Sequence, residues 1–398
     1  MTTPRNLAVV MISNFGRADG GRETWAYQFL PQLLARNSGL SAQLYGLRVD
    51  GQADNSPALE SSIAAEDQPR FRQRFFSASR NRIPNSLKMI WAMFRHDWFA
   101  AESNFQLALG VGSFIELISM LAAPGLRGVP KAVWLRTIYV DEKSDRIPAW
   151  LRSLARIVET AVLRRADLVI ANGDDTAAYY RARGLTVEVI KNAVDLDRWR
   201  MAPPTLERPI DVAFIGRLTA LKGCPEFLEA CRRLTAGADE GMFRFHTIGE
   251  GPFGPEAQAL AAQGRLSCHG FVANDLLPQI LERIDVCVAL TLVRQAAGDE
   301  IGGSGTSNAL LEQMAAGRVC ICWDNAAFRQ MIDEQSAYLV PQGDTDGLVA
   351  ALQDIALNPG EAMRRARNAA KLAEDYGLEN HLGRFERAVS RWLPLAAS

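Results

Sequence analysis

The sequence of 398 residues lacks the cysteine and histidine patterns that hold metal ions or disulfide frameworks. Its six cysteines include no CxxC pair, and its four histidines include no HExxH spacing. These absences argue against a zinc site and predict reduced, buried thiols, as in a cytosolic protein. We therefore expect neither a bound metal ion nor a cofactor.

A charge excess and a long apolar run are also missing. The 44 lysines and arginines balance 45 acidic residues, so the net charge of -1 gives no reason to expect nucleic acid as a partner. Residues 7–13 are apolar but too short for a signal peptide, and no run approaches the roughly 20 apolar residues that span a bilayer. We expect a soluble, cytoplasmic protein that touches the inner face of a membrane at most peripherally.

What the chain does contain is two series of short, β-branched apolar runs separated by helical stretches such as 23–36 and 147–165. The strand candidates are 7–13, 42–48, 105–109, 131–136, 168–171 and 187–190, and then 211–215, 243–248, 266–271, 286–290, 319–323 and 337–340. Such alternation predicts two Rossmann-like α/β domains, each a doubly wound parallel sheet that binds ligands at the carboxyl ends of its strands. The segment 201–205, with two prolines, has the composition of an interdomain linker. We place the first domain at 1–202 and the second at 203–377.

One glycine-bearing turn follows the first strand of the second series. Arg217 and Lys222 lie in it, flanked by Gly216 and Gly223, at the edge of the sheet where a ligand binds. A guanidinium fork and an ammonium group are suited to a diphosphate. The alternative, that both are solvated loop charges, explains neither the flanking glycines nor a second anion site downstream.

That second site is the glycine-rich stretch 302–305 and the helix start after it. Thr306 or Ser307 can cap the helix, whose first-turn N–H groups and macrodipole attract an anion. Asn308 and Glu312 share one helical face, so the carboxylate can accept both hydroxyls of a ribose about one turn beyond the phosphate. The alternative is an ordinary helix after a glycine loop, ended by Gly317. Together, the two turns predict a pocket for a nucleoside diphosphate that carries a sugar.

A third glycine-rich segment, Gly249 to Gly254, matches the GxGxxG pattern of dinucleotide sites but lacks their context. It follows the second strand of its domain rather than the first, and Pro252 and Pro255 reshape the turn. No acid ends the next strand, where Phe271 and Val272 stand instead. We do not interpret it as a nicotinamide site.

Residues 70–95 combine seven basic residues with interleaved aromatic residues and no acid. The interpretation that we favour is an ordinary amphipathic helix with a solvated basic face and inward aromatics. The alternative is a surface helix that makes peripheral contact with anionic lipid or holds a charged acceptor.

Taken together, these motifs resemble those of the GT-B glycosyltransferases of family 4, over nearly the whole chain. The motifs that carry the resemblance are Gly20-Gly21-Arg22-Glu23, Arg165 to Ile170, Asn192-Ala193-Val194-Asp195, Gly216-Arg217 with Lys222-Gly223, Gly249 to Pro252, His269 to Val272, Ser307 to Ala315 and Asn380 to Trp392. The resemblance implies two Rossmann-like domains facing a central cleft, with the final helix, 378–398, packed back on the first domain. It also implies an enzyme that transfers a sugar from a nucleotide-diphosphate sugar with retention and without metal.

The resemblance implies a set of donor-binding residues, with Arg217 and Lys222 as the catalytic clamp on the departing diphosphate. The remaining donor contacts that it implies are Gly20, Gly21, Gly216, Phe271, Val272, Ser304, Gly305, Thr306, Ser307, Asn308 and Glu312. The acceptor is a glycan, a lipid-linked molecule or a small molecule; among donors, UDP-sugars come first and GDP-mannose second. Two other functions stay open: a catalytically silent nucleotide-sugar-binding protein and a nucleotide-sugar epimerase.

Two positions depart from the family's pattern. Ser304 stands where the family has a first glutamate that contacts the donor sugar, and Asp299 or Glu300 could replace it. Ile138 stands where many relatives carry a histidine. Arg136, Tyr139 or Asp141 would then position the acceptor, and we take Asp141 as the catalytic candidate.

Overall fold

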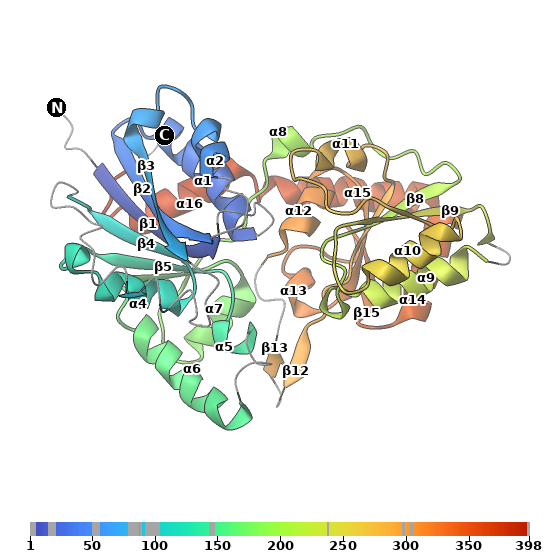
Figure 1. Cartoon of the computed structure of the whole chain (residues 1–398). Coiled ribbons are helices and arrows are strands. Elements are labelled where there is room, and N and C mark those ends of the chain that lie inside the picture. The colour runs from blue at the N-terminus through green and yellow to red at the C-terminus, as the bar shows by residue number, and fades with distance from the viewer. Residues whose placement is uncertain are drawn as a thin grey trace. The chain divides into compact units, whose positions relative to one another are not determined.

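The chain divides into two compact units, one of Met1–Asn192 with Glu379–Ser398 and one of Ala193–Leu378. Each unit is a parallel sheet covered by helices (Figure 1). The computed structural model describes residues 5–14, 21–49, 56–78, 87, 90–91, 104–142, 148–236, 239–296, 299–301 and 306–395.

The first unit contains a seven-stranded parallel sheet in the order β3-β2-β1-β4-β5-β6-β7. Its strands are β1 (Arg5–Asn14), β2 (Leu40–Val49), β3 (Phe71–Ala78), β4 (Leu107–Gly112), β5 (Lys131–Leu135), β6 (Leu168–Ala171) and β7 (Glu188–Val189). Its helices are α1 (Gly21–Arg36), α2 (Ser56–Ser62), η1 (Gln68–Arg70), α4 (Phe114–Ala122), η2 (Pro124–Leu126), α5 (Tyr139–Glu142), α6 (Ala149–Leu163), α7 (Asp174–Arg181) and α16 (Leu378–Val389).

The second unit contains a six-stranded parallel sheet in the order β10-β9-β8-β11-β14-β15 and a separate antiparallel pair, β12-β13. Its strands are β8 (Ile210–Ile215), β9 (Phe243–Ile248), β10 (Leu266–Cys268), β11 (Val286–Ala289), β12 (Arg294–Ala296), β13 (Asp299–Ile301), β14 (Val319–Asp324) and β15 (Tyr338–Pro341). Its helices are α8 (Leu196–Trp199), η3 (Ala220–Lys222), α9 (Cys224–Leu234), α10 (Gly254–Ala262), α11 (Leu277–Leu281), α12 (Asn308–Ala315), α13 (Ala326–Arg329), α14 (Thr345–Leu357) and α15 (Pro359–Glu374).

Both sheets reverse their strand order at the first strand, between β1 and β4 and between β8 and β11. In such doubly wound sheets ligands bind outside the carboxyl ends of the strands at this reversal. The two parallel α/β sheets confirm the fold class expected from the alternating pattern. The buried residues of β8, β11 and β14 are almost entirely apolar, as a sheet covered on both faces requires.

The second unit begins at Ala193, before the proline-containing segment that we interpreted as the linker. Trp199 is fully buried in the core of this unit. The Val194 N–H donates to the Tyr376 carbonyl over 3.0 Å, which ties the start of the unit to its end. Residues 193–202 therefore belong to the second unit, because burial of Trp199 outweighs the loop-like composition that follows it.

Helix α16 packs on the first unit through an aromatic cluster. The Phe385 ring stacks on Trp134 with centroids 5.6 Å apart, and the Phe29 ring meets Phe385 edge-on at 5.0 Å. His381 accepts a hydrogen bond from Trp25 Nε1 and contacts the Lys191 carbonyl through Nδ1 over 2.7 Å. Burial lowers the pKa of His381 to about 3, so its ring is neutral and donates to that carbonyl.

The segment 71–78, which we expected to be helical, is the edge strand β3. Its register on β2 pairs Phe71 with Ala42 and continues to Ala78. Arg72 and Arg74 alternate with inward residues and are exposed, as basic residues on an edge strand commonly are. Arg70 donates to the carbonyls of Leu34, Asn37 and Leu40 and pairs with Asp67. It therefore joins the start of β3 to α1 and β2. Of the rest of 79–95, only 87, 90 and 91 are described, and they are helical.

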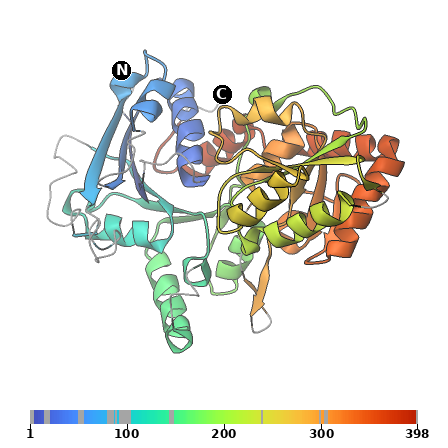
Figure 2. The ribbon, with the colours of Figure 1, turned by 45° about the vertical axis from the view of Figure 1, so that its right-hand side comes forward.

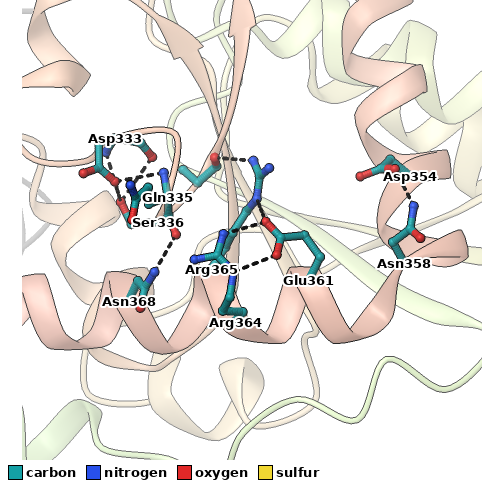
Figure 3. A network of polar contacts seen from close by, with 10 residues as sticks. Asp333, Gln335, Ser336, Asp354, Asn358, Glu361, Arg364, Arg365 and Asn368 are labelled. Carbon is teal, nitrogen blue, oxygen red and sulfur yellow. Dashed lines mark hydrogen bonds and ion pairs between the residues drawn. The ribbon is translucent and has the colours of Figure 1, made fainter.

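The long helix α15 packs against α12. Polar contacts hold the first turns of α15 (Figure 3). Glu361 accepts from Arg364 and Arg365, and Arg365 also donates to the Ala337 carbonyl over 2.9 Å. The alanines of α15 form its buried stripe, which lets α12 and α15 approach closely. These contacts fix the helix that bears Glu312.

Five of the six cysteines are buried free thiols, and Cys268 is exposed. Among the described helices, none has both the length and the apolar character needed to cross a bilayer.

Candidate functional site

The turn after β8 is fixed by its contacts with the turn after β9. The Gly216 N–H donates to the Ile248 carbonyl, and the Leu218 N–H donates to the Glu250 carbonyl, each over 2.9 Å. A Cβ atom at Gly249, where φ is +134°, would lie 2.1 Å from the Gly216 carbonyl oxygen. Only glycine permits this approach. The segment that resembled a dinucleotide motif is therefore the packing partner of the turn that carries Arg217.

Lys222 lies at the end of η3, between the two strands that flank the reversal of the second sheet. Its Nζ donates to Thr291 Oγ1, just beyond β11, over 3.2 Å. The Leu292 N–H donates to the Leu221 carbonyl over 2.8 Å, so main chain and side chain join the two segments. Burial, with added repulsion from Arg217, lowers the pKa of Lys222 to about 8. Arg217 itself is exposed.

The first turn of α9 starts directly after this lysine. A Cβ atom at Gly223, where φ is +75°, would meet the Leu290 carbonyl oxygen at 2.5 Å, so this glycine allows the loop to close on β11. The structure thus brings Gly216, Arg217 and Lys222 together at the carboxyl edge of the second sheet. An Arg and a Lys at this place can neutralise a phosphate group.

Helix α12 lies between the parallel strands β11 and β14 in the chain, so its N-terminus lies at the carboxyl edge of the second sheet. Ser307 is its N-cap: the hydroxyl accepts from the Leu310 N–H over 3.3 Å. Thr306 is buried beside it. The Oδ1 atom of Asn308 is buried and has no hydrogen-bond partner among the described residues. A buried acceptor without a partner costs free energy that a bound donor group would recover.

Glu312 is buried one turn further along α12, with 8% of the residue's surface exposed. Its Oε1 accepts from Asn274 Nδ2 over 3.3 Å. Burial raises the pKa of the Glu312 carboxyl to about 7, while the Asn274 hydrogen bond and the Arg198 charge oppose the rise. Arg198 donates to the Asn274 carbonyl, so the three residues form one polar group in the second unit.

Phe271 and Val272 lie in a turn after β10 rather than on the strand, which ends at Cys268. Phe271 is 55% exposed, whereas Val272 packs partly against the core of the second unit. The turn is held by His269, whose Nε2 lies 3.1 Å from His246 Nδ1. His246 Nε2 lies in turn 2.7 Å from Asp211 Oδ1, and burial with repulsion from His246 lowers the pKa of His269.

Several sequence-predicted residues lie outside the described part of the chain. These are Gly20, Ser304 and Gly305, together with the side chains of Asp141, Asp299 and Glu300, whose backbones belong to α5 and β13. Gly21 is the first residue of α1. Ile138, which stands where many relatives carry a histidine, is buried in the core of the first unit. Such burial is usual for isoleucine. Tyr139 meets the Phe114 ring edge-on at 5.4 Å.

Sequence reasoning missed three residues that the structure brings to this site: Thr291, Asn274 and Arg198. Thr291 follows a predicted strand at the carboxyl edge, a placement that could have signalled it. Arg198 comes three residues after the Asn192 to Asp195 motif, whose Asp195 caps α8. Asn274 offers no such signal, because its contact with Glu312 joins the loop after β10 to helix α12, 38 residues further along the chain.

Two family models match successive parts of the chain. The model described as Glycosyltransferase Family 4 matches residues 20–198, and the model described as Glycosyl transferases group 1 matches residues 209–358. The two matches follow the two units of the structure closely.

Known proteins agree with the family models. The chain is 25% identical over 308 residues to a 2-deoxystreptamine glucosyltransferase of Streptomyces kanamyceticus, covering 69% of this chain and 76% of that protein. It is 26% identical over 227 residues to a putative colanic acid biosynthesis glycosyltransferase of Salmonella typhimurium, covering 54% of each chain. The solved structure of Anabaena HepE in complex with UDP superposes with a TM-score of 0.71 at 15% identity, covering 97% of this chain and all of that one, which supports a shared fold. The chain is a GT-B glycosyltransferase of the family 4 type.

Proposed function

We propose that the protein is a retaining, metal-independent hexosyltransferase that uses a nucleotide-diphosphate sugar. The observation that carries this proposal is the placement of Lys222 beside Arg217 at the reversal of the second sheet, tied to Thr291. Among the described residues, neither of these two cations pairs with an acidic side chain. A diphosphate would supply an anionic partner and restore the ordinary pKa of Lys222.

We place the remaining donor contacts at the same carboxyl edge of the second sheet. The N-terminus of α12, capped by Ser307, would hold a phosphate oxygen through its free N–H groups. Glu312 would accept the ribose hydroxyls in place of Asn274, and Asn308 Oδ1 would gain the donor that it lacks. Phe271 would lie against the base. We favour UDP, which the similar HepE structure contains, with GDP next.

The chemistry is a group transfer at the anomeric carbon of the donor sugar. The bond from that carbon to the diphosphate oxygen breaks, and a bond to the acceptor hydroxyl oxygen forms on the same face. The acceptor proton passes to an oxygen of the departing diphosphate, so no separate base is needed. Arg217, Lys222 and the α12 N-terminus stabilise the negative charge that grows on the leaving group, which typically contributes a few kcal/mol for each donor.

The acceptor that we propose is a hydroxyl of a glycan, a lipid-linked glycan or a small polyhydroxy molecule. The names of two relatives mention 2-deoxystreptamine and colanic acid biosynthesis. Asp141, on the short helix α5 after β5, is our candidate for positioning that hydroxyl in the first unit. Ser304, Gly305, Gly20 and Gly21 complete the donor-contact set that we propose.

A transfer assay tests the proposal. Purified full-length protein is incubated with UDP-glucose, UDP-N-acetylglucosamine or GDP-mannose, with a chelator and a panel of these acceptors. NMR of the product's anomeric proton then reports the configuration. We expect the same anomeric configuration in donor and product, and at least a tenfold loss of turnover in Arg217→Ala and Lys222→Ala. The matched control is Arg233→Ala, because Arg233 is an exposed arginine of α9 that pairs with Asp346 of α14.

The other outcomes separate the competing functions. Turnover of Arg217→Ala and Lys222→Ala within about threefold of wild type would contradict the proposed clamp. Nucleotide binding without transfer to any acceptor would favour a silent nucleotide-sugar-binding protein. Conversion of the donor to an epimer without acceptor would indicate an epimerase.

A further inference from the structure

Helix α6 of the first unit presents a face of large apolar side chains to solvent. Trp150, Leu154, Ile157 and Val158 are 79%, 55%, 65% and 46% exposed. Their spacing of four, three and one residues places them on one side of the helix. In Figures 1 and 2, α6 is the light green helix that projects away from the sheet of its own unit.

Helix α6 buries polar residues beside the core residues Val162 and Leu163, although a helix on a globular protein usually turns polar residues outward. Such a helix normally turns its apolar stripe toward the core and its charges outward. Here Glu159 is buried and accepts from the Tyr180 hydroxyl over 2.9 Å. Arg152 and Arg156 are half-buried on the same inner side. The sequence of α6 is therefore amphipathic, but its apolar face is the one left uncovered by the described residues.

The exposed charges next to this face are mainly basic. In the described stretches 104–140 and 148–167, Glu116 and Glu159 are buried, and Asp167 is the exposed acid. The exposed basic residues of these stretches are Arg127, Arg164 and Arg165. Arg164 and Arg165 follow the C-terminal end of α6, on the side of the apolar face. Asp167 accepts from the Lys131 N–H over 2.8 Å, so an anionic partner would meet more cations than acids there.

We propose that α6 rests in the surface of an anionic lipid bilayer, a partner that goes beyond the proposed transferase activity. Trp150, Leu154, Ile157 and Val158 enter the boundary between headgroups and acyl chains, and Arg164 and Arg165 contact lipid phosphates. The helix lies in the plane of the interface, since it is too short to span the bilayer. This surface differs from the 70–95 stretch, whose residues 71–78 form strand β3.

The size of the face favours a lipid surface over a second copy of the chain. The exposed residues of α6 and its ends are Pro148, Trp150, Ser153, Leu154, Ile157, Val158, Ala161, Arg164 and Arg165. A stable protein interface takes about 20–30 residues from each partner. A bilayer needs only a narrow apolar stripe flanked by cations, which is what α6 offers.

Sedimentation of the full-length protein with lipid vesicles tests this surface. One set of vesicles is phosphatidylcholine alone, and the other contains about one third phosphatidylglycerol. We expect binding to the anionic vesicles and little to the neutral ones. The double substitution Trp150→Ser with Ile157→Ser should weaken that binding by more than about tenfold. Leu357→Ser is the matched control, because Leu357 is 72% exposed at the end of α14 in the second unit.

A second variant separates loss of the surface from loss of folding. Trp150→Phe keeps the apolar face, so it should bind anionic vesicles like the wild type. Brominated lipids should quench the fluorescence of the wild type on binding and quench Trp150→Phe much less, because Trp150 is the tryptophan that enters the bilayer. Equal quenching of the two proteins would overturn the proposal.

Three further results would also overturn it. The first is no binding to anionic vesicles, or equal binding to neutral ones. The second is loss of binding in Trp91→Ser with retention in the Trp150 and Ile157 double variant, which would assign lipid contact to the 70–95 stretch. The third is a wild-type dimer in velocity sedimentation that the double variant converts to a monomer, which would show that a second copy covers α6.

Discussion

Lys222 Nζ donates to Thr291 Oγ1 over 3.2 Å, a contact between the loops that follow β8 and β11. These two strands are the neighbours at which the second sheet reverses its order. The hydroxyl holds the ammonium group in place without neutralising it. The lysine is therefore positioned to bind an anion rather than committed to an ion pair.

The first prediction concerns this pair. Lys222→Ala should weaken UDP binding at least tenfold, because it removes a charge, whereas Thr291→Val should weaken it only about threefold, because it removes only the positioning hydrogen bond. Isothermal titration calorimetry measures both. If Thr291→Val is as damaging as Lys222→Ala, the hydroxyl contacts the ligand itself and the positioning role is wrong.

The second prediction is a bell-shaped dependence of nucleotide affinity on pH. Ribose hydroxyls donate to the charged form of Glu312, whose pKa is about 7, so affinity should rise as pH increases through that value. The diphosphate favours charged Lys222, whose pKa is about 8, so affinity should fall as pH increases beyond it. Calorimetry between about pH 5.5 and 9.5 covers both limbs.

Two variants assign the limbs of that profile. Glu312→Gln should remove the acid limb and leave the alkaline one. Lys222→Arg should remove the alkaline limb, because a guanidinium stays charged throughout this range. An acid limb that persists in Glu312→Gln would show that another group titrates, and His269 would be the next candidate.

The third prediction concerns stability. Burial raises the pKa of Glu312 from 4.5 to about 7, so the folded protein holds this proton more tightly than the unfolded chain does. Stability is therefore lost as pH rises from about 4.5 to about 7, by up to roughly 3 kcal/mol. Glu312→Gln should be more stable than wild type at pH 8 and similar near pH 5, as urea unfolding can measure. Glu207→Gln, at an exposed position in the same unit, is the control. No gain at pH 8 would contradict the buried carboxylate.

The fourth prediction tests the packing of the two turns. Gly249→Ala places a Cβ atom 2.1 Å from the Gly216 carbonyl oxygen and strains the backbone, so it should abolish nucleotide binding and cost more than about 3 kcal/mol of stability. Gly264→Ala is the control: its φ is +71°, but a Cβ atom there meets nothing within 4 Å. It should cost about 1 kcal/mol, from backbone strain alone. Equal effects of the two substitutions on binding would mean that the contact with Gly216 is unimportant.

The sequence predicted the sheets well, because buried parallel strands are apolar runs bounded by turns. Its error at 71–78 has a physical origin: the phenylalanines at 71, 75 and 76 also fit a helical spacing. The segment forms a strand because it pairs with β2. No local sequence pattern reports such a long-range contact. The same reason explains the boundary at Asn192, because the burial of Trp199 in the second core depends on the completed fold.

The candidate site, like the fold, could be predicted from the sequence only in part. The glycines, the cations and the carboxylate were identifiable from turn chemistry and helix spacing. The Thr291 contact to Lys222 and the Asn274 contact to Glu312 were not, because each joins segments that are far apart in sequence and that only the folded unit brings together. Phe271 was placed on a strand, yet Gly270, at a φ of +65°, turns the chain away after Cys268.

Calorimetric titration of UDP, GDP, ADP and dTDP, without metal, into wild type, Arg217→Ala and Arg233→Ala tests the central claim most directly. We predict that one nucleotide, UDP, binds the wild type and Arg233→Ala alike, and that Arg217→Ala weakens its binding at least tenfold. Absence of binding by any of the four, or equal binding by all three proteins, would contradict a diphosphate site at the carboxyl edge of the second sheet.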